Sequence, residues 1–302
     1  MDAYEEMLMR LKDIDLIGQI GSLISWDQEV MMPPKGAPMR AEQLAWISKT
    51  AHERLTDSRI GDLLDRLEMD DDLDEVQRAN IRLARESYDR ATRLPTEFVE
   101  EMAKHRSKSL VSWTEAREKD DFSIFRDDLA IAIEHARKKA DFYGYENLRY
   151  DALLDLYESG LTVQRLDPLF SGLRDNVAPL IRSVVDSGKR PDISWVEGNS
   201  WEQPAQERLS QSVSEAIGFD FSAGRRDLST HPFCGGPNPD DVRWTTRYSK
   251  KNPFSSLFGS MHETGHGTYE QGRPRELDFQ PAGKANGLGI HESQSRLWEN
   301  QV

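Results

Sequence analysis

The sequence predicts a mainly α protein, a multi-helix fold with one small β element near its C-terminal end. Apolar residues recur at a helical period through roughly the first 220 residues, with breaks that separate helices of roughly 15–25 residues. Only one short segment alternates with the period of a strand. The 302 residues suffice for one large domain or two closely packed ones. We expect a single domain, with an N-terminal helical part over residues 1–160 and a second part over residues 161–302.

Apolar periodicity and helix breakers divide the first part of the chain. A run of leucines and isoleucines at helical spacing begins at Leu8, and Pro33 ends it. Pro95 separates two long helices further on. Thr162 has the character of an N-cap, and Gly218 ends the last helix of the series. Helices are therefore predicted over residues 8–24, 39–55, 60–67, 75–92, 96–119 and 123–143.

Residues 241–248 form the predicted β element. Their alternation places Val242, Trp244, Thr246 and Tyr248 on one face, and these are β-branched and aromatic residues. Such a strand could add a substrate peptide along an exposed edge. Alternatively, it belongs to a small structural sheet.

Two further helices are predicted after this strand. Pro253 is in a favourable first-turn position, and the helix that it begins continues to about Tyr269, with Gly272 just past its end. A loop that contains several glycines leads to a final helix over residues 292–301.

Charge and composition exclude some partners. The net charge is -14 and the pI is about 5.0, which repels nucleic acid and anionic membranes, although acidity also simply favours solubility. The N-terminus lacks the pattern of a signal peptide, and no segment approaches the roughly 18 apolar residues of a membrane span. Cys234 is the only cysteine, which fits a reducing compartment. We therefore expect a cytoplasmic protein without nucleic-acid or membrane partners.

The pentapeptide from His262 to His266 has the spacing of a zinc site. Residues four apart lie on one face of a helix, roughly 6 Å apart, so both imidazoles can be directed at one ion. Glu263 lies beside that face, where a general base for metal-activated water is needed. The alternative is a pair of surface histidines that happen to be one turn apart.

Gly265 and Glu292 support the zinc interpretation. Gly265 lies within the predicted helix, where glycine costs roughly 1 kcal/mol relative to alanine. A closely packed neighbour would explain this cost, although glycine can also simply be tolerated there. Catalytic zinc takes three protein ligands and leaves one position for water. Glu292, on the next predicted helix, would complete that set with His262 and His266 around one ion per chain, with zinc favoured and cobalt possible.

Several segments across the whole chain carry a family resemblance. They are SWDQ (25–28), MPP (32–34), RAEQL (40–44), YDALLD (150–155), STHPF (229–233), DVRWT (241–245), HETGH (262–266) and HES (291–293). In this order they resemble the carboxypeptidase Taq family of zinc metallocarboxypeptidases. The resemblance implies a largely helical, zincin-like peptidase with HExxH in the floor of a long groove and the β element beside it.

The resemblance also implies an activity. Family members are cytosolic and commonly homodimeric, and they release residues one at a time from peptide C-termini with broad specificity. Carried over residue by residue, His262, His266 and Glu292 match the metal ligands, and Glu263 matches the catalytic glutamate. Peptides are therefore the expected partners.

Three other residues are candidates for substrate binding. His231 and Arg243 match family segments near the active site. Arg243 could bind a terminal carboxylate through two hydrogen bonds from its guanidinium group. The alternative is an ion pair with a neighbouring Asp. His231 either contacts substrate or belongs to the core. His291 either hydrogen-bonds a ligand or substrate, or is a packed histidine at a helix start.

Family members continue well beyond the position of Val302. We therefore expect the C-terminal part of the family, with groups that hold the substrate carboxylate and the oxyanion, to be absent from this chain. Three functions stay open on this basis: a metallocarboxypeptidase, a related helical oligopeptidase with the same zinc helix, and a catalytically incomplete chain that binds metal without hydrolysing peptides.

Overall fold

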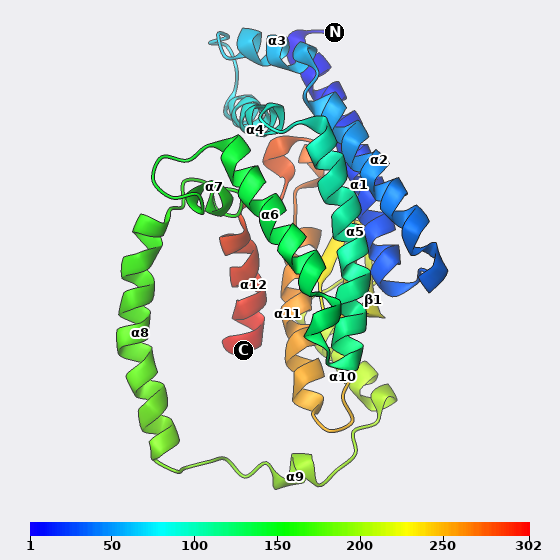
Figure 1. Ribbon diagram of the computed structural model, residues 1–302, viewed down its shortest axis with the longest axis vertical. Coiled ribbons are helices and arrows are strands. Elements are labelled where there is room, and N and C mark those ends of the chain that lie inside the picture. Colours follow the sequence, from blue (N-terminus) through cyan, green and yellow to red (C-terminus); the bar gives the residue numbers. More distant parts are fainter.

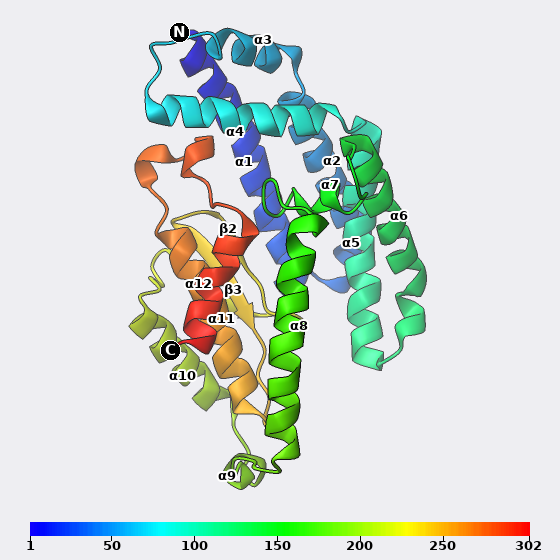
Figure 2. The same cartoon turned by 90° about the vertical axis from the view of Figure 1, so that its left-hand side faces the viewer.

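Long helices that lie side by side make up the first half of the computed structural model, which describes residues 1–302 (Figure 1). Their bounds are Ala3–Val30 for α1, Ala37–Leu55 for α2, Ser58–Leu67 for α3, Glu75–Thr92 for α4, Thr96–Lys119 for α5 and Arg126–Tyr143 for α6. α2 packs along both α1 and α5, and α6 packs along α5. α3 and α4 cross the end of this group where the N-terminus lies (Figure 2).

The core of this group lies where α1, α3 and α4 meet. Its buried side chains are Met7, Ile60, Leu63, Leu64, Leu67, Ile81 and Ala84. Leu8, Leu11 and Ile14 of α1 pack against them, as the apolar period predicts. Ile20 continues the same pattern but is 54% exposed, so the apolar face of α1 extends beyond the part that this core covers.

A long connection leads from these helices to the C-terminal part. Its helices are α7 (Asp151–Leu154), α8 (Val163–Asp186), α9 (Ser194–Glu197) and α10 (Gln203–Ile217). The side chain of Thr162 accepts a hydrogen bond from the backbone N–H of Arg165, so it is the N-cap that the sequence predicts for α8. Gly218 ends α10 in the left-handed conformation, with φ of 106°, which confirms the predicted end.

α8 differs from the other long helices because none of its residues is buried. Figure 1 shows it standing apart from α5, α6 and α11. Its exposed apolar side chains are Leu169, Phe170, Leu173, Val177, Leu180, Ile181, Val184 and Val185. The 302-residue chain therefore carries a continuous exposed apolar surface along this helix.

β3 (Asp241–Thr246) is the strand that the sequence predicts, and it is the central strand of a three-stranded sheet with the order β1-β3-β2. β1 (Gly224–Leu228) pairs with it in parallel, and β2 (Cys234–Asn238) pairs with it antiparallel. Both edges of β3 are thus occupied. The hypothesis that this strand adds a substrate peptide along an exposed edge is wrong, and the alternative of a small structural sheet is correct.

α11 (Pro253–Gln271) packs against β3 and α10, and α12 (Leu288–Asn300) packs along α11. Asn80 of α4 holds the connection between these two helices. Its amide oxygen accepts from the backbone N–H of Ala282 at 2.8 Å, and its nitrogen donates to Gln280 Oε1 at 2.7 Å. Because the connection is anchored on the N-terminal helices, α12 returns beside α11 (Figure 2).

A buried row of polar side chains sets the register of α10 against α11. Residues one helical turn apart on each helix meet in pairs: Gln206 with Ser256 at 2.6 Å, Ser210 with Ser260 at 3.0 Å, and Ser214 with Thr264 at 2.8 Å. All six are at most 5% exposed. Since buried polar groups need partners, sliding α11 by one turn would break several of these bonds at once.

The remaining regular structure is short. 3-10 turns cover Pro34–Gly36, Phe122–Ile124, Arg275–Leu277 and Pro281–Gly283. None of the helices combines the length and the apolar character that crossing a lipid bilayer requires.

Candidate metal centre

α11 directs two histidines toward one point. His262 and His266 are one helical turn apart, and their ring centroids are separated by 4.8 Å. Their side chains are only 18% and 13% exposed. Both lie inside the helix that the sequence predicts around them, so they are not freely exposed surface residues.

α12 brings a carboxylate to the same point. Glu292 Oε2 lies 3.6 Å from His262 Nε2 and 3.3 Å from His266 Nε2. Zinc bonds nitrogen and carboxylate oxygen at about 2.0–2.2 Å, and a tetrahedral site then separates neighbouring ligand atoms by about 3.4 Å. The three ligand atoms, all within 4.8 Å of one another, therefore fit one such ion. These three residues are called the His-His-Glu cluster below.

Glu263 lies beside the His-His-Glu cluster and is only 6% exposed. Burial, together with the negative charges of Glu292 and Glu299, raises the pKa of Glu263 to about 8. A divalent cation nearby would act in the opposite direction, because it favours the ionised carboxylate. A carboxyl group with such a pKa can exchange protons near neutral pH.

A second carboxylate contacts the cluster from outside. His262 Nδ1 lies 2.9 Å from Glu299 Oε2. A carboxylate only accepts hydrogen bonds, so Nδ1–H is the donor to Glu299, and Nε2 on the other side of the ring faces Glu292. Sequence reasoning missed Glu299. Its position two turns after Glu292 is a signal that could have found it, because residues seven apart share one helix face.

His291 packs against the cluster and does not complete it. Its ring stacks on that of His266 with centroids 4.5 Å apart and an interplanar angle of 27°. Its Nε2–H donates to Glu270 Oε1 at 2.8 Å. Burial, then the charges of His291 and His262, lower the pKa of His266 to about 4. His291 thus has an internal partner, which agrees with the alternative of a packed histidine at a helix start.

Arg243 and His231 have hydrogen-bond partners outside this cluster. Arg243 Nε and Nη2 donate to the two oxygens of Asp241 at 2.8 and 2.9 Å, and its guanidinium lies 4.5 Å from the ring centroid of Trp26. This is the ion pair that the sequence offered as the alternative role. His231 is exposed, and its Nδ1 bonds the carbonyl oxygen of Pro232 at 2.6 Å. No hydrogen bond or ion pair connects either residue to His262 or His266.

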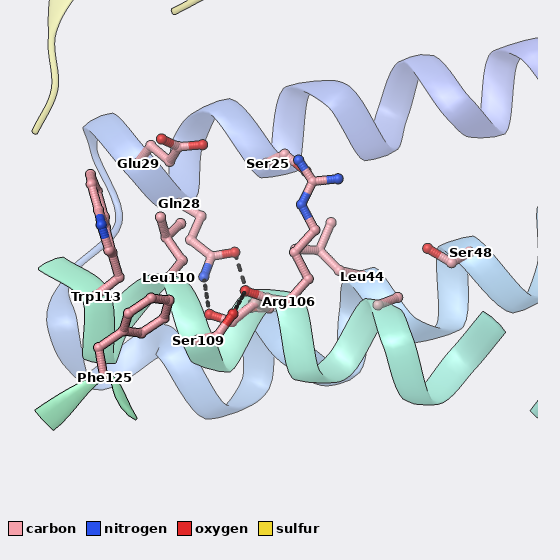
Figure 3. Close-up of a pocket in the computed structure, with 12 residues that line it drawn as sticks. Ser25, Gln28, Glu29, Leu44, Ser48, Arg106, Ser109, Leu110, Trp113 and Phe125 are labelled. Atoms are coloured by element: carbon pink, nitrogen blue, oxygen red, sulfur yellow. Dashed lines mark hydrogen bonds between the residues drawn. The ribbon is translucent and has the colours of Figure 1, made fainter. Parts of the chain in front are cut away.

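A separate cavity of about 380 Å³ lies between α1, α2 and α5 (Figure 3). Gln28 and Ser107 exchange two hydrogen bonds of 3.0 Å inside it. Glu29 and Arg106 contribute opposite charges to its wall. Burial raises the pKa of Glu29, and the positive charge of Arg106 opposes this rise. The cavity contains no residue of the His-His-Glu cluster.

A mainly helical chain with two histidines one turn apart and a carboxylate from the following helix defines the class of helical metallopeptidases. The family model described as carboxypeptidase Taq (M32) metallopeptidase matches residues 6–302. The chain belongs to this family, which confirms the resemblance in its sequence motifs.

Curated relatives and solved structures agree with this assignment. The chain is 38% identical to thermostable carboxypeptidase 1 of Thermus thermophilus, over 99% of this chain and 61% of that protein. It is 36% identical to carboxypeptidase 1 of Bacillus subtilis, over 99% of this chain and 60% of that protein. The chain therefore spans about 60% of the length of these relatives.

The fold is that of solved carboxypeptidases. The crystal structure of BsuCP superposes with a TM-score of 0.97 at 36% identity, over 99% of this chain and 60% of that chain. The Pyrococcus furiosus carboxypeptidase (Apo-Mg) superposes with a TM-score of 0.88 at 34% identity, over 100% of this chain and 61% of that chain. Since both matches cover nearly the whole chain, they include α8 and α12 as well as the helices around the core.

Proposed function

We propose that this protein is a zinc-dependent metallocarboxypeptidase that releases amino acids from peptide C-termini with broad specificity. The observation that carries this proposal is the position of Glu292 Oε2, 3.6 Å from His262 Nε2 and 3.3 Å from His266 Nε2. Membership of the carboxypeptidase Taq family and the names of the relatives support peptide hydrolysis.

His262, His266 and Glu292 would hold one divalent ion per chain. Two imidazoles and one carboxylate are the ligand set of several catalytic zinc sites, and cobalt is accommodated by the same donors. Zinc bound there would polarise the scissile carbonyl and lower the pKa of a water molecule toward about 7.

Glu263 would act first as a general base and then as a general acid. Its carboxylate would accept a proton from the attacking water and deliver that proton to the nitrogen of the leaving amine. Burial raises the pKa of Glu263 to about 8, and the positive charge of a bound ion would lower it again, so that the carboxylate is ionised and can accept the proton at neutral pH. The burial of Glu263 also keeps bulk water from competing for its carboxyl group.

The predicted substrate-binding roles place different demands on Arg243, His231 and His291. The guanidinium of Arg243 would have to break its ion pair with Asp241 before it could bind a terminal carboxylate. His231 is exposed and could contact a peptide without such a change. His291 would act through its contact with His266.

We also propose a cytoplasmic location and a homodimeric state. The single cysteine supports the location, because a protein that needs no disulfide suits a reducing compartment. The dimer rests on the family alone, and light scattering after size-exclusion chromatography would test it.

The decisive experiment compares a peptide with a free C-terminus and the same peptide with a C-terminal amide. A carboxypeptidase releases amino acids from the free peptide alone, whereas an oligopeptidase cuts both. Zinc content is measured in parallel. One zinc per chain with hydrolysis of neither peptide would replace the proposal with a metal-binding chain that does not hydrolyse peptides.

A matched variant isolates the chemical step. Glu263→Gln keeps the shape of the side chain but cannot accept the proton, so it should retain zinc and lose hydrolysis by several orders of magnitude. Unchanged hydrolysis in Glu263→Gln would remove Glu263 from the mechanism.

A further inference from the structure

Arg296 connects the His-His-Glu cluster to the carboxylate of Glu299. Its Nε donates to Glu292 Oε1 at 2.9 Å, and its Nη1 donates to Glu299 Oε2 at 2.8 Å. The same oxygen of Glu299 accepts from His262 Nδ1 at 2.9 Å. Because Glu292 Oε2 faces His262 Nε2 at 3.6 Å, these four side chains form a closed ring.

Helix spacing explains how a single element supplies three members of this ring. Glu292 and Arg296 are four residues apart and Arg296 and Glu299 are three apart, so all three lie along one face of α12. The planar guanidinium has donors on two sides and can bond two carboxylates at once. It also places a positive charge between Glu292 and Glu299, which would otherwise repel each other.

We propose that Arg296 and Glu299 are positioning residues for the metal centre. The proposal rests on the proposed function, because it concerns the ion that His262, His266 and Glu292 would hold. Arg296 engages Oε1 of Glu292, so that only Oε2 is directed at the two imidazoles. Glu299 accepts the Nδ1–H of His262 and thereby fixes the tautomer whose Nε2 lone pair faces the cluster.

Exposure allows this role to be separated from a contribution to folding. Arg296 is 54% exposed and Glu299 is 22% exposed. The ion pairs of the exposed Arg296 therefore add little to the free energy of unfolding, and Glu299→Gln keeps an acceptor at the partly buried position 299. Removing an outer partner of a metal-binding histidine, in contrast, weakens metal binding by roughly 10- to 100-fold. A positioning role therefore predicts a large change in metal affinity with a small change in stability.

The test measures the zinc Kd of the 302-residue chain by competition with a coloured chelator at fixed pH. Arg296→Met and Glu299→Ala should each raise the zinc Kd by roughly 10- to 100-fold. Glu299→Gln should raise it less, because the amide oxygen still accepts the Nδ1–H of His262. The control Arg137→Met removes a comparable exposed pair with Glu134 on α6 and should leave the Kd unchanged. After metal removal, Arg296→Met and Glu299→Gln should melt within about 3 °C of the parent.

A spectroscopic readout follows the orientation of Glu292 directly. In Arg296→Met both oxygens of Glu292 are free to bind, which raises the coordination number. Cobalt absorbs visible light less strongly as its coordination number rises above four, so the cobalt complex of Arg296→Met should absorb less than that of the parent. The same measurement on Arg137→Met should give the parent spectrum.

The possible results distinguish a failure of the positioning role from a failure of the proposed function. Parent-like zinc Kd values in both Arg296→Met and Glu299→Ala, with parent-like cobalt spectra, would overturn the positioning role and leave the proposed function intact. A parent chain that binds neither zinc nor cobalt would overturn the proposed function, and the positioning role with it.

Discussion

The backbone of Ser295 in α12 lies directly against Gly265 in α11, so that a β-carbon at position 265 would be 2.7 Å from the Ser295 Cα. It would also be 2.6 Å from the carbonyl oxygen of Gln294. This contact explains why a glycine stands within the helix despite its cost, and it confirms the close neighbour that the sequence suggested. The close packing of α12 on α11 also brings the Glu292 carboxylate beside the imidazole of His262.

Gly265→Ala should therefore damage both stability and metal binding. The added methyl group meets backbone atoms that cannot rotate away, so α12 must shift from α11, at a cost of about 1–3 kcal/mol in the free energy of unfolding. Because Glu292 moves with α12, we expect the zinc Kd to rise by roughly 10-fold or more. Urea unfolding and chelator competition measure the two effects.

Gly259→Ala is the matched control on the same helix. A β-carbon there would meet nothing within 4 Å, so only helix propensity changes. We expect a gain of about 0.4–1 kcal/mol in the free energy of unfolding and an unchanged zinc Kd. Equal effects of the two substitutions would show that the contact with Ser295 does not position α12.

The row of polar pairs between α10 and α11 leads to a second prediction, at Gln206. Its Nε2 donates to the carbonyl oxygens of Trp201 at 2.7 Å and Ser249 at 3.0 Å, and its Oε1 accepts from Ser256. Gln206→Met keeps the volume but removes the donor to both carbonyl oxygens, while Ser256 keeps only its bond to the Pro253 carbonyl oxygen, so a loss of about 2–3 kcal/mol in the free energy of unfolding is expected. Thermal and urea unfolding provide the measurement.

Gln211→Met is the control, because it removes a glutamine amide that is not part of the buried polar row. Gln211 lies on the same helix, but it is only half-buried, and its side chain bonds only Glu215 on its own helix, where the bond is open to solvent. This variant should stay within about 0.5 kcal/mol of the parent. A loss at Gln206 no larger than the loss at Gln211 would mean that the polar row contributes nothing to the packing of α10 on α11.

Local signals made much of the fold predictable. Pro95 and a capping box at Asp74 fix the ends of α4 and α5, whose bounds match the predicted helices. Period-2 alternation identified β3, and the HExxH spacing identified the histidine face of α11. These features depend on residues within a few positions of one another, which a single sequence displays directly.

Features that depend on distant partners could not be predicted. β2 contains Gly235, Gly236 and Pro237, which are unfavourable in strands, and it exists because β3 supplies its hydrogen bonds. Glu299 was missed for this reason. The seven-residue spacing places it on the same face of α12 as Glu292, but it does not show that His262 of α11 contacts that face. The role of Arg243 was undecided for a different reason: Asp241 is only two residues away, but the sequence alone does not say whether the guanidinium bonds this neighbour or a substrate.

The ion pair of Glu6 leads to a prediction of how the free energy of unfolding depends on pH. Its carboxylate accepts from Arg59 at 2.8 and 2.5 Å, and this hydrogen bond lowers the pKa of Glu6 from 4.5 to about 2, with Arg10 acting in the same direction. A carboxyl whose pKa is lower in the folded chain stabilises the fold fully above pH 4.5 and loses that contribution as the pH falls toward 2.

The comparison of the parent with Glu6→Gln isolates this effect. The variant cannot titrate at position 6, so its deficit in the free energy of unfolding should be constant at neutral pH and should shrink as the pH falls from 4.5 toward 2. Urea unfolding at a series of pH values measures the deficit. A deficit that stayed the same throughout that range would contradict the low pKa of Glu6.

The N-terminus of α12 is held by two residues far away in the sequence. Glu158 Oε2 accepts from the backbone N–H of Gly289 at 3.1 Å, and the carbonyl oxygen of Tyr157 accepts from the N–H of Leu288 at 2.9 Å. No side chain of the helix itself caps this end. A β-carbon at Gly287 would be 2.6 Å from Glu158 Oε2, so the glycine permits the close approach.

Glu158→Ala should loosen the first turn of α12 and, through it, Glu292. The loss of a cap costs about 1 kcal/mol, and the loss of a negative charge at a helix N-terminus contributes to that figure. Hydrogen exchange at Gly289 should quicken, and the zinc Kd should rise because Glu292 lies in the next turn. Glu146→Ala removes an exposed carboxylate outside these contacts and should change neither quantity. Faster exchange with an unchanged zinc Kd would mean that Glu292 is held by the contact of α12 with α11 alone.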